Sequence, residues 1–398
     1  MRKKPIILHI CKDYPDAIQS ADKTKAVANL VENAKDFDHI VFSLNRTSSL
    51  AKRSVIRENP LFAINYWGLP GGIGLKSSMA KTAGTIEEII QQERLSFDLV
   101  HAHKLTMEGI IGYHISKRFQ KPMACTIRGQ TDFEVIRYKP HYRKFFAEIL
   151  KHAQWLFFLA PWTQKEIGKT FPGITEHKSS MLPNIVYYAA PEKRREPILS
   201  NRLITAVRFD AKNFKSKYLG TTIAAFDRAC RKIGDIHLDI AGGGNSPNKD
   251  KTKRLLNSVP SAANIHLTGN MDNARFCEVL PDYAAFVRPS YPETFGMVYL
   301  EALFAGIPVL HTKNTGIDGY FPNAPFTVAV DYRSPEAIAE GIIDLYKNQK
   351  ELKSRLQKRL NTGDFSLFLK ENIVRSYIAH IENVLKNQKS RSKTLMNS

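Results

Sequence analysis

Residues 288–303 read RPSYPETFGMVYLEAL, the most informative stretch of the chain. Two carboxylates, Glu293 and Glu301, stand on either side of Gly296, where a loop is expected to lead into a helix. Pro292 disfavours helix at the residue before it, and the Glu-Ala-Leu-Phe-Ala run from Glu301 favours helix. A helix N-terminus has unpaired N–H groups and a positive partial charge, and therefore binds phosphate. Phosphate at the helix start and carboxylates on hydroxyl groups together predict a nucleotide-sugar site.

Short apolar runs alternate with helical stretches along the chain, which predicts parallel sheets covered by helices. Prolines and a charged run between 183 and 200 predict an interdomain linker. We therefore expect an α/β protein with two doubly wound, Rossmann-like domains, 1–190 and 198–367, that face a central cleft. The predicted strands are 6–11, 39–44, 99–103, 122–127, 155–160, 203–207, 236–241, 264–268, 284–288 and 308–312. The predicted helices are 23–34, 77–93, 108–119, 219–233, 275–280, 334–345 and 368–385.

The composition of the 398 residues is ordinary for a globular protein, except for a net charge of +20 that is spread over both halves. A basic surface attracts nucleic acid, anionic lipid or phosphorylated substrates. We find no recognition-helix pattern and expect no nucleic-acid partner. The N-terminus has too short an apolar run for a signal peptide, which predicts a cytoplasmic protein. The four cysteines are too dispersed to predict a disulfide framework or a zinc site.

The stretch 288–303 resembles the Glu-x7-Glu motif of the retaining glycosyltransferases with the GT-B fold, family 4 (glycosyl transferases group 1). Solvated helix-face glutamates are the alternative interpretation, but the residues around Glu293 and Glu301 favour the motif. The resemblance implies transfer of a hexose-type sugar, with retained configuration, from a nucleotide-diphosphate sugar. It also implies a glycan or lipid-linked saccharide acceptor in cell-surface polysaccharide synthesis, no cofactor and no metal. The last helix, within 368–398, would cross back to the first domain.

Two cations of the second half match family positions that neutralise the donor diphosphate. Arg208 follows a predicted strand, and the carboxyl ends of such strands are where ligands bind. Lys217 matches the family lysine, with Lys212 and Lys215 as nearby alternatives. Tyr218 stands in place of the glycine that follows this lysine in the family. A solvated basic loop is the alternative interpretation.

The acids and the residues near them receive the remaining donor roles by resemblance. Glu301 would accept hydrogen bonds from the ribose, and Glu293 would hold sugar hydroxyls and stabilise positive charge at the anomeric carbon. The helix start would stabilise the leaving diphosphate. The other predicted donor-binding residues are Phe295, Gly296, Met297, Val298, Asn270 and Gly316.

The first half has two more segments that resemble the family. In Asp-Leu-Val-His-Ala-His, His101 and His103 share one face of a strand; a joint metal site would need a third ligand, and none stands out. The resemblance instead places His103 at the strand end, in the cleft near the donor sugar, as a catalytic candidate. Arg128 replaces a family histidine in a Thr-x-His-Gly-x-Asp pattern that ends at Asp132, and both are predicted to face the acceptor or the cleft; a simple turn is equally compatible.

Two further segments bear on the hypothesis. Residues 11–23 lack the family's glycine pair, for which Ser20 and Ala21 are candidate substitutes. Residues 137–146 interleave basic and aromatic side chains, which indicates either an exposed amphipathic helix or contact with an anionic membrane surface at the inner face of the plasma membrane. The rival functions are a nucleotide-sugar epimerase of the same architecture and a non-catalytic nucleotide-sugar-binding protein.

Overall fold

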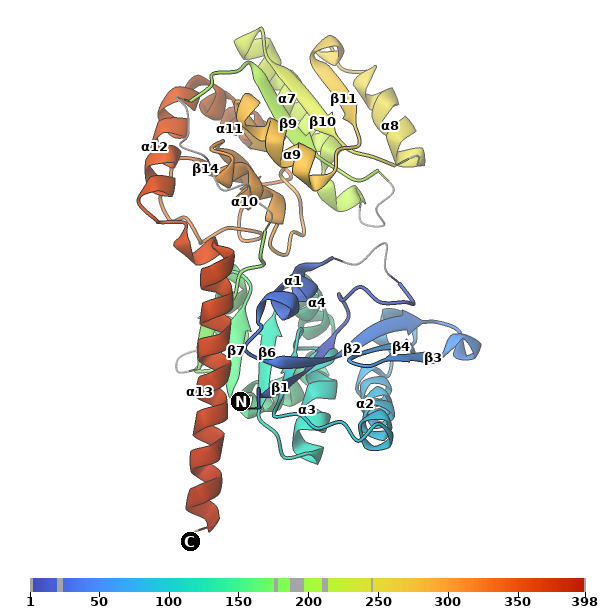
Figure 1. The fold of residues 1–398 in the computed structure, drawn as a ribbon. Coiled ribbons are helices and arrows are strands. Elements are labelled where there is room, and N and C mark those ends of the chain that lie inside the picture. The colour runs from blue at the N-terminus through green and yellow to red at the C-terminus, as the bar shows by residue number, and fades with distance from the viewer. Residues whose placement is uncertain are drawn as a thin grey trace. The chain divides into compact units, whose positions relative to one another are not determined.

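The computed structural model describes residues 3–19, 24–174, 178–186, 197–209, 214–244 and 246–396. The chain divides into two compact units, each with its own sheet (Figure 1). Unit 1 comprises 1–185 and 368–398, and unit 2 comprises 186–367. Three sequence predictions lie outside the described residues: the charged run of the linker, the turn at Ser20, and Lys212.

Unit 1 contains an eight-stranded sheet in the order β3-β4-β2-β1-β5-β6-β7-β8. Every pairing in it is parallel except β3 with β4. The central strand β1 reads IILHIC, and burial on both faces explains its almost continuous apolar sequence. The strands are β1 (Ile6–Cys11), β2 (Asp38–Thr47), β3 (Ser54–Glu58), β4 (Leu61–Trp67), β5 (Leu99–Ala102), β6 (Met123–Ile127), β7 (Trp155–Phe158) and β8 (Ser179–Met181).

Helices follow most strands of unit 1, and the last helix of the chain returns to pack on its sheet. In α13 (Lys370–Met396), the side chains of Ile373, Tyr377 and Ile381 are buried and join a core cluster with Ile7 of β1 and Phe157 of β7. Each such apolar side chain contributes about 1.5–3 kcal/mol by leaving water. The other helices are α1 (Ala26–Asn33), η1 (Leu50–Lys52), η2 (Pro70–Gly72), α2 (Leu75–Gln92), α3 (Glu108–Arg118), α4 (Gln130–Tyr138), η3 (Pro140–Tyr142), α5 (Arg143–His152) and α6 (Pro161–Thr170).

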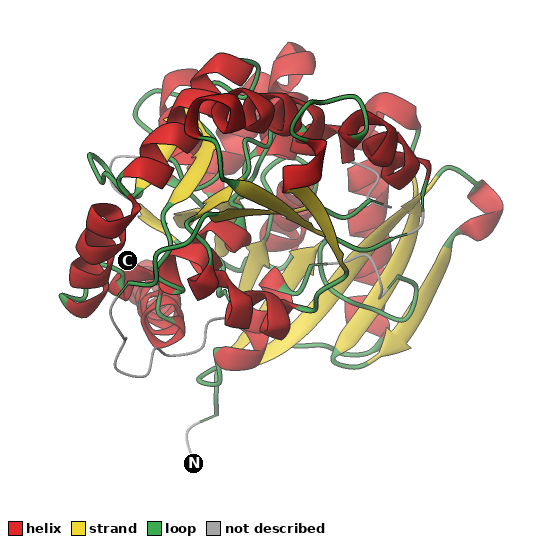
Figure 2. Cartoon of the chain, turned by 90° about the horizontal axis from the view of Figure 1, so that it is seen from above, coloured by secondary structure: helices red, strands yellow, loops and turns green. Residues whose placement is uncertain are grey.

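Unit 2 contains a six-stranded, wholly parallel sheet in the order β11-β10-β9-β12-β13-β14. The strands of both units, drawn in yellow, lie among helices drawn in red (Figure 2). The predicted fold class, α/β with parallel sheets, is confirmed. The strands are β9 (Arg202–Ala206), β10 (His237–Ala241), β11 (Ile265–Gly269), β12 (Ala285–Val287), β13 (Val309–Thr312) and β14 (Thr327–Val330).

The helices of unit 2 place apolar stripes on this sheet. In α7 (Leu219–Ile233), the buried residues Leu219, Ile223 and Phe226 recur at helical spacing and face the core. Gly234 follows its last residue with a φ of 92°, which suits glycine at a helix end. The other helices are η4 (Phe214–Lys217), α8 (Pro247–Leu256), η5 (Ala262–Asn264), α9 (Asn273–Val279), η6 (Leu280–Asp282), α10 (Met297–Phe304), α11 (Pro335–Lys347), α12 (Gln349–Asn361) and η7 (Ser366–Phe368).

Candidate functional site

Glu293 is surrounded by three donors, all within reach of its Oε2 atom. Lys217 Nζ lies 3.3 Å away, a guanidinium nitrogen of Arg288 lies 3.4 Å away, and the hydroxyl of Ser290 donates over 3.0 Å. Burial opposes ionisation of Glu293, but the two cations and the Ser290 hydrogen bond outweigh it and lower the pKa of the carboxyl below its usual value. Glu293 is therefore an anion at neutral pH.

The two cations, Lys217 and Arg288, lie in different electrostatic and hydrogen-bonding environments. Burial and the neighbouring Arg288 lower the pKa of Lys217 against the opposing effect of Glu293. The Nε atom of Arg288 is buried, and no described residue accepts a hydrogen bond from it. The side chain as a whole is 13% exposed, and a guanidinium with an unused donor is suited to bind an anion. The sequence analysis predicted Lys217 but missed Arg288, although Arg288 directly follows β12, where a parallel sheet binds ligands.

Two glycines shape the loop around Glu293. Gly296 precedes α10 with a φ of 73°, and a Cβ atom there would lie 2.4 Å from the ring of Tyr299. Gly316 has a φ of 62°, and its backbone N–H donates to the carbonyl oxygen of Glu293 over 2.9 Å. Thr315 also hydrogen-bonds to the backbone of Glu293. The loop therefore holds Glu293 next to the start of α10, as the sequence predicts for this segment.

Glu301 lies inside α10, where its side chain is almost fully buried. Its Oε1 atom accepts a hydrogen bond of 3.1 Å from the amide of Asn273 in α9. Burial raises the pKa of Glu301 to about 7, and neither Asn273 nor the charge of Arg288 fully offsets this effect. The two glutamates therefore have opposite electrostatic environments: Glu293 is held ionised, while Glu301 changes charge near neutral pH.

The carboxyl ends of β9, β10 and β11 meet at a glycine turn. A Cβ atom on Gly242 would lie 2.1 Å from the carbonyl oxygen of Val207, and one on Gly243 would lie 2.5 Å from the side chain of Asn270. Only glycine therefore fits at Gly242, where the obstacle is backbone, and a larger residue at Gly243 would displace the side chain of Asn270. Arg208 lies next to Val207 and is exposed at this edge. The structure thus places Arg208 and Asn270 at the same edge of the sheet as Glu293.

The remaining predicted donor residues differ in exposure. Phe295 is buried with 2% exposed, and its ring packs edge-on against Tyr320, so its side chain serves the core. Met297 and Val298 are half-buried in the first turn of α10. Lys215 is exposed near the end of η4, whereas Lys217 reaches Glu293.

An aromatic stack that the sequence analysis did not predict lies beside Lys217. Tyr218 has a φ of 49°, the left-handed conformation that glycine favours, which matches its place at a family glycine. Its ring contacts Tyr332, with centroids 4.6 Å apart, and Tyr332 stacks on Tyr291 at 4.4 Å. Tyr332 follows β14, far along the chain, so local sequence carries no signal for this contact.

In unit 1, Asp132 and Arg128 belong to a buried polar cluster at the carboxyl ends of the strands. Asp132 accepts hydrogen bonds from the backbone and hydroxyl of Thr106, at 3.0 and 2.9 Å, and from the N–H of Arg128 at 3.3 Å. Burial raises the pKa of Asp132 against these hydrogen bonds. The guanidinium of Arg128 donates to Asn184 over 2.7 Å.

A partly buried ion pair lies near this cluster and was not predicted. Lys104 Nζ is 2.6 Å from a carboxylate oxygen of Asp13 and 3.8 Å from Glu108. The second carboxylate oxygen of Glu108 is buried and has no hydrogen-bond partner among the described residues. Asp13 follows β1, in the segment that lacks the family glycine pair. Charged side chains thus occupy this part of the first loop.

His103 is buried, with 1% exposed, in a cluster of imidazoles. Its Nε2 atom is 3.0 Å from Nδ1 of His9, and His9 Nε2 is 2.9 Å from Nδ1 of His39. His101 hydrogen-bonds to Tyr377 of α13 and to Thr126. No third ligand for a metal site at His101 and His103 stood out in the sequence, whereas the structure brings His9 close to both, and its partner in the β1–β5 register is His101.

Comparison with known proteins identifies unit 2. Residues 209–362 match the family described as glycosyl transferases group 1, a range that contains Lys217, Glu293 and Glu301. Most of unit 2 thus matches the model of this family. The predicted resemblance is therefore confirmed.

Relatives of this chain match it over different lengths. The 2-deoxystreptamine N-acetyl-D-glucosaminyltransferase of Niallia circulans is 24% identical over 140 residues, which is 35% of this chain and 36% of the relative. The putative teichuronic acid biosynthesis glycosyltransferase TuaC of Bacillus subtilis (strain 168) is 24% identical over 292 residues, 71% of this chain and 70% of the relative. The first of these matches spans about a third of the relative's length.

Solved structures share the fold of this chain over nearly its whole length. A glycosyltransferase from Rickettsia africae ESF-5 has a TM-score of 0.68 at 15% identity and covers 96% of this chain and 99% of its own. Anabaena Alr3699/HepE in complex with UDP has a TM-score of 0.67 at 13% identity, with 95% and 100% covered. The GT-B-like architecture predicted from the sequence is therefore confirmed.

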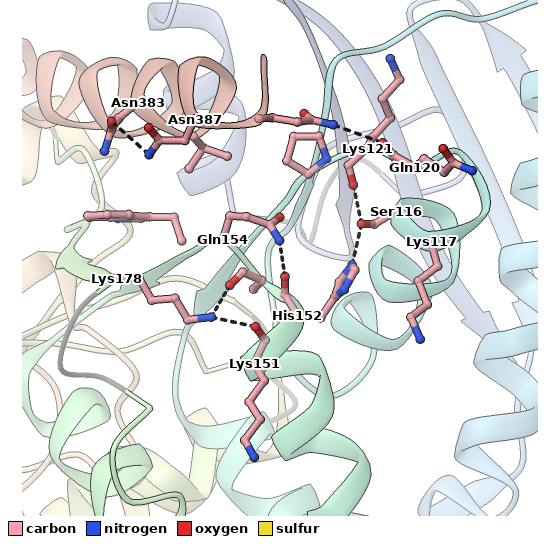
Figure 3. A pocket seen from close by; sticks show the side chains of 15 residues that line it. Ser116, Lys117, Gln120, Lys121, Lys151, His152, Gln154, Lys178, Asn383 and Asn387 are labelled. Atoms are coloured by element: carbon pink, nitrogen blue, oxygen red, sulfur yellow. Dashed lines mark hydrogen bonds between the residues drawn. The ribbon is translucent and has the colours of Figure 1, made fainter. Parts of the chain in front are cut away.

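A pocket of about 770 Å³ lies in unit 1, outside the matched range (Figure 3). It lies where β6 and β7 begin, whereas ligands of open parallel sheets bind where strands end. Lys178 at its edge donates to the carbonyl oxygens of Lys151 and Ala153, at 2.8 and 2.6 Å. The residues that line it include no acid and four lysines: Lys117, Lys121, Lys151 and Lys178.

Among the residues that the structure describes, no helix combines the length and the apolar character needed to cross a bilayer.

Proposed function

We propose that the chain is a retaining glycosyltransferase that moves a sugar from a nucleoside-diphosphate sugar to an acceptor hydroxyl. The observation that carries the proposal is the environment of Glu293: a carboxylate only 14% exposed and held ionised by Lys217 and Arg288 beside the start of α10. Cations, an oriented helix start and a fixed anion are the groups that departure of a diphosphate from a sugar requires. The group 1 family match over this segment supports the proposal.

The leaving group would be stabilised by cations of the protein. As the glycosidic bond breaks, negative charge grows on the diphosphate, and Arg208, Lys217 and Arg288 would carry the opposing charge together with the first N–H groups of α10. Arg288 brings a buried donor that no described residue uses. These groups would supply the charge that a divalent cation supplies in other glycosyltransferases, and we propose a metal-independent reaction.

The two glutamates would bind different parts of the donor. Glu293 would accept hydrogen bonds from sugar hydroxyls and stabilise positive charge at the anomeric carbon. Glu301, which lies in the second turn of α10, would accept hydrogen bonds from the ribose hydroxyls. A ribose hydroxyl donates most strongly to a carboxylate, so donor binding would favour the ionised form of Glu301.

The experiment that tests this function is a screen of nucleotide sugars for thermal stabilisation, followed by transfer assays. A ligand that binds only the folded protein stabilises it by about 2.7 kcal/mol at one hundred times its Kd. UDP-glucose and UDP-N-acetylglucosamine are the first donors to try, because a structural neighbour contains UDP and a relative transfers N-acetylglucosamine. Transfer to an added saccharide supports the proposal. Epimer formation from donor alone, or binding without turnover, would replace it with one of the two rival functions.

For the acceptor, we propose a glycan or lipid-linked saccharide used in cell-surface polysaccharide synthesis. TuaC, which matches 71% of this chain, is described as a putative teichuronic acid biosynthesis glycosyltransferase and supports this class. We place the reaction in the cytoplasm, at the inner face of the plasma membrane. The exposed residues Arg137, Tyr138, Arg143 and Lys144 support contact with anionic lipid, because basic and aromatic side chains together suit a bilayer surface.

A further inference from the structure

The pocket of about 770 Å³ in unit 1 is formed by the last helix of the chain and by segments at the amino ends of three strands. One wall is the face of α13 that carries Asn383 and Asn387, and Gln388 of this helix donates to the carbonyl oxygen of Gln120 over 3.2 Å. The other walls are the end of α3 with the turn after it, the end of α5 with the turn into β7, and the residue before β8. Pockets of roughly 300–1,000 Å³ hold small organic ligands. A ligand in this pocket would therefore contact α13 and the body of unit 1 together.

The charged side chains of the lining all have the same sign. Lys117, Lys121, Lys151 and Lys178 line the pocket, together with no aspartate, glutamate or arginine. Their amino groups form no ion pair with an acid in the part of the chain that the structure describes. In Figure 3, Lys178 donates to two carbonyl oxygens near the middle of the view, and the other three amino groups lie farther out. An ammonium group has three N–H bonds, so Lys178 has one that these carbonyls do not use.

His152 lies in the positive potential of these lysines. Its Nε2 atom is 2.8 Å from the hydroxyl of Ser116, which itself donates to the carbonyl oxygen of Lys121 over 2.6 Å. The hydroxyl proton is thus used, so Ser116 accepts from Nε2–H of His152. Burial lowers the pKa of His152, and the charges of Lys117 and Lys178 lower it further. The pocket therefore disfavours another cation and favours an anion.

The residue types of the lining indicate which anion it suits. Lysine binds phosphate as a point charge, whereas a carboxylate is matched best by the planar fork of arginine, which this lining lacks. Amide side chains can bind the uncharged polar groups of an organic ligand. The amides of the lining are those of Gln120, Gln154, Asn383, Asn387 and Gln388.

We propose that this pocket is a further ligand site, which binds a polar molecule carrying phosphate groups between α13 and the amino ends of β6 and β7. The site does not depend on the proposed transfer reaction, because none of its residues belongs to the matched range or to the groups assigned to the donor. A free phosphorylated compound and the headgroup of an anionic lipid both offer this chemistry. The experiment below distinguishes these two sources.

Two side chains of the pocket report binding in the full-length protein. Inorganic pyrophosphate, added at constant ionic strength, should raise the pKa of His152, because a nearby anion favours the charged imidazolium. A titration by 1H–15N NMR measures this, and the His152 signal is assigned by its loss in His152→Gln. Trp155 also lines the pocket, and its indole stacks on His380 with ring centres 4.3 Å apart. Its fluorescence should change in a saturable way, and Trp155→Phe should remove that change.

Vesicles distinguish the source of the phosphate. Phosphatidylglycerol vesicles offer an anionic headgroup, and phosphatidylcholine vesicles are the neutral control. A Trp155 response to pyrophosphate but not to either vesicle assigns the site to a soluble ligand, and a response to phosphatidylglycerol vesicles alone assigns it to a headgroup. If neither pyrophosphate nor phosphatidylglycerol changes the signals of His152 and Trp155, the pocket is not a phosphate site.

Charge variants show whether the pocket or the general surface attracts the anion. In the double variant Lys117→Gln with Lys151→Gln, the affinity for pyrophosphate should fall about tenfold, at about threefold for each exposed charge. The matched control is Lys52→Gln with Lys81→Gln, which are exposed on unit 1 outside the pocket and should bind like the wild type. Equal losses in the two double variants would overturn the proposal.

A change in unit 2 separates this inference from the proposed function. Lys217→Ala removes a cation assigned to the donor diphosphate, and the response of His152 to pyrophosphate should stay the same. Loss of that response in Lys217→Ala would place the anion in unit 2 and overturn the proposal. If the protein transfers no sugar, the proposed function fails while the response of His152 still stands.

Discussion

At the scale of single residues, the charge on Glu293 allows the most direct test of the proposed function. In Glu293→Gln, the amide keeps the size of the side chain but removes the anion that Lys217 and Arg288 surround. We expect kcat to fall about a hundredfold or more, the size of effect seen when one fixed electrostatic group is removed from an active site. Steady-state kinetics measure this, and circular dichroism confirms that the variant folds.

The matched control for this change is Glu278→Gln, which also removes a carboxylate paired with an arginine. Glu278 is exposed and lies 2.6 Å from Arg275 on the surface of α9. Exposed pairs contribute little, so its turnover should equal that of the wild type. Wild-type turnover in Glu293→Gln as well would remove Glu293 from the mechanism.

The raised pKa of Glu301 predicts a dependence of stability on pH. An acid whose pKa is about 7 when folded and near 4.5 when unfolded binds more protons in the folded state between these values, so it destabilises the fold as pH rises. Glu301→Gln removes this effect. Relative to the wild type, the free energy of unfolding of the variant should therefore rise by roughly 3 kcal/mol between pH 4.5 and pH 8. Urea unfolding at both values measures the difference, and a constant difference would contradict the raised pKa.

The same titration predicts how donor binding depends on pH. Because ribose hydroxyls donate to the ionised carboxyl, UDP should bind more tightly as pH rises from 6 to 8. Glu301→Gln should lose this dependence, and comparison with it cancels the titration of the UDP phosphate itself. Calorimetric titration at several pH values gives both Kd series. Parallel series for the two proteins would show that Glu301 does not contact the nucleotide.

At the scale of elements, the start of α10 depends on Gly296. Any residue at this position must adopt a φ of 73°, and its Cβ atom would lie 2.4 Å from the ring of Tyr299. Gly363 has a similar φ of 83° but open space around it, so Gly363→Ala measures the backbone cost alone, about 1–2 kcal/mol. Gly296→Ala should destabilise the protein by more than this and abolish donor binding. Equal melting temperatures for the two variants would show that the loop relaxes freely.

The elements also show what the sequence can and cannot predict. The helix at 219–233 was predicted with the ends that the structure has, because its apolar spacing and the glycine that follows are both local signals. The edge strand β3 was missed because it is short and mostly exposed, so it lacks the apolar alternation that marks a strand. Glu293 was predicted from a contiguous motif. Arg288 was missed although it lies in the same stretch as Glu293, directly after β12. Tyr332, His9 and His39 were not predicted as partners, because their contacts join segments that are far apart in the sequence.

At the scale of the whole molecule, the net charge of +20 needs a location before it explains anything. The surface at α4 to α5 offers one, because Tyr138 is 74% exposed and Arg137, Arg143 and Lys144 are exposed around it in sequence. Phe146 of the same segment is buried in the core, so only part of the predicted basic and aromatic run can meet a bilayer. Surface charge alone attracts any polyanion, whereas an exposed tyrosine among basic residues favours a lipid interface.

Liposome flotation distinguishes these explanations. The protein should float with anionic vesicles and not with neutral ones, and replacing Arg137, Arg143 and Lys144 with Gln should weaken binding on the order of a hundredfold, at about 1 kcal/mol for each charge. The matched control replaces Lys347, Lys350 and Arg355, exposed on α11 and α12, and should bind like the wild type. If both triple variants lose affinity equally, net charge alone drives adsorption. If the wild type binds neither kind of vesicle, the acceptor reaches the protein without a membrane surface. A free saccharide then becomes the better candidate for the acceptor.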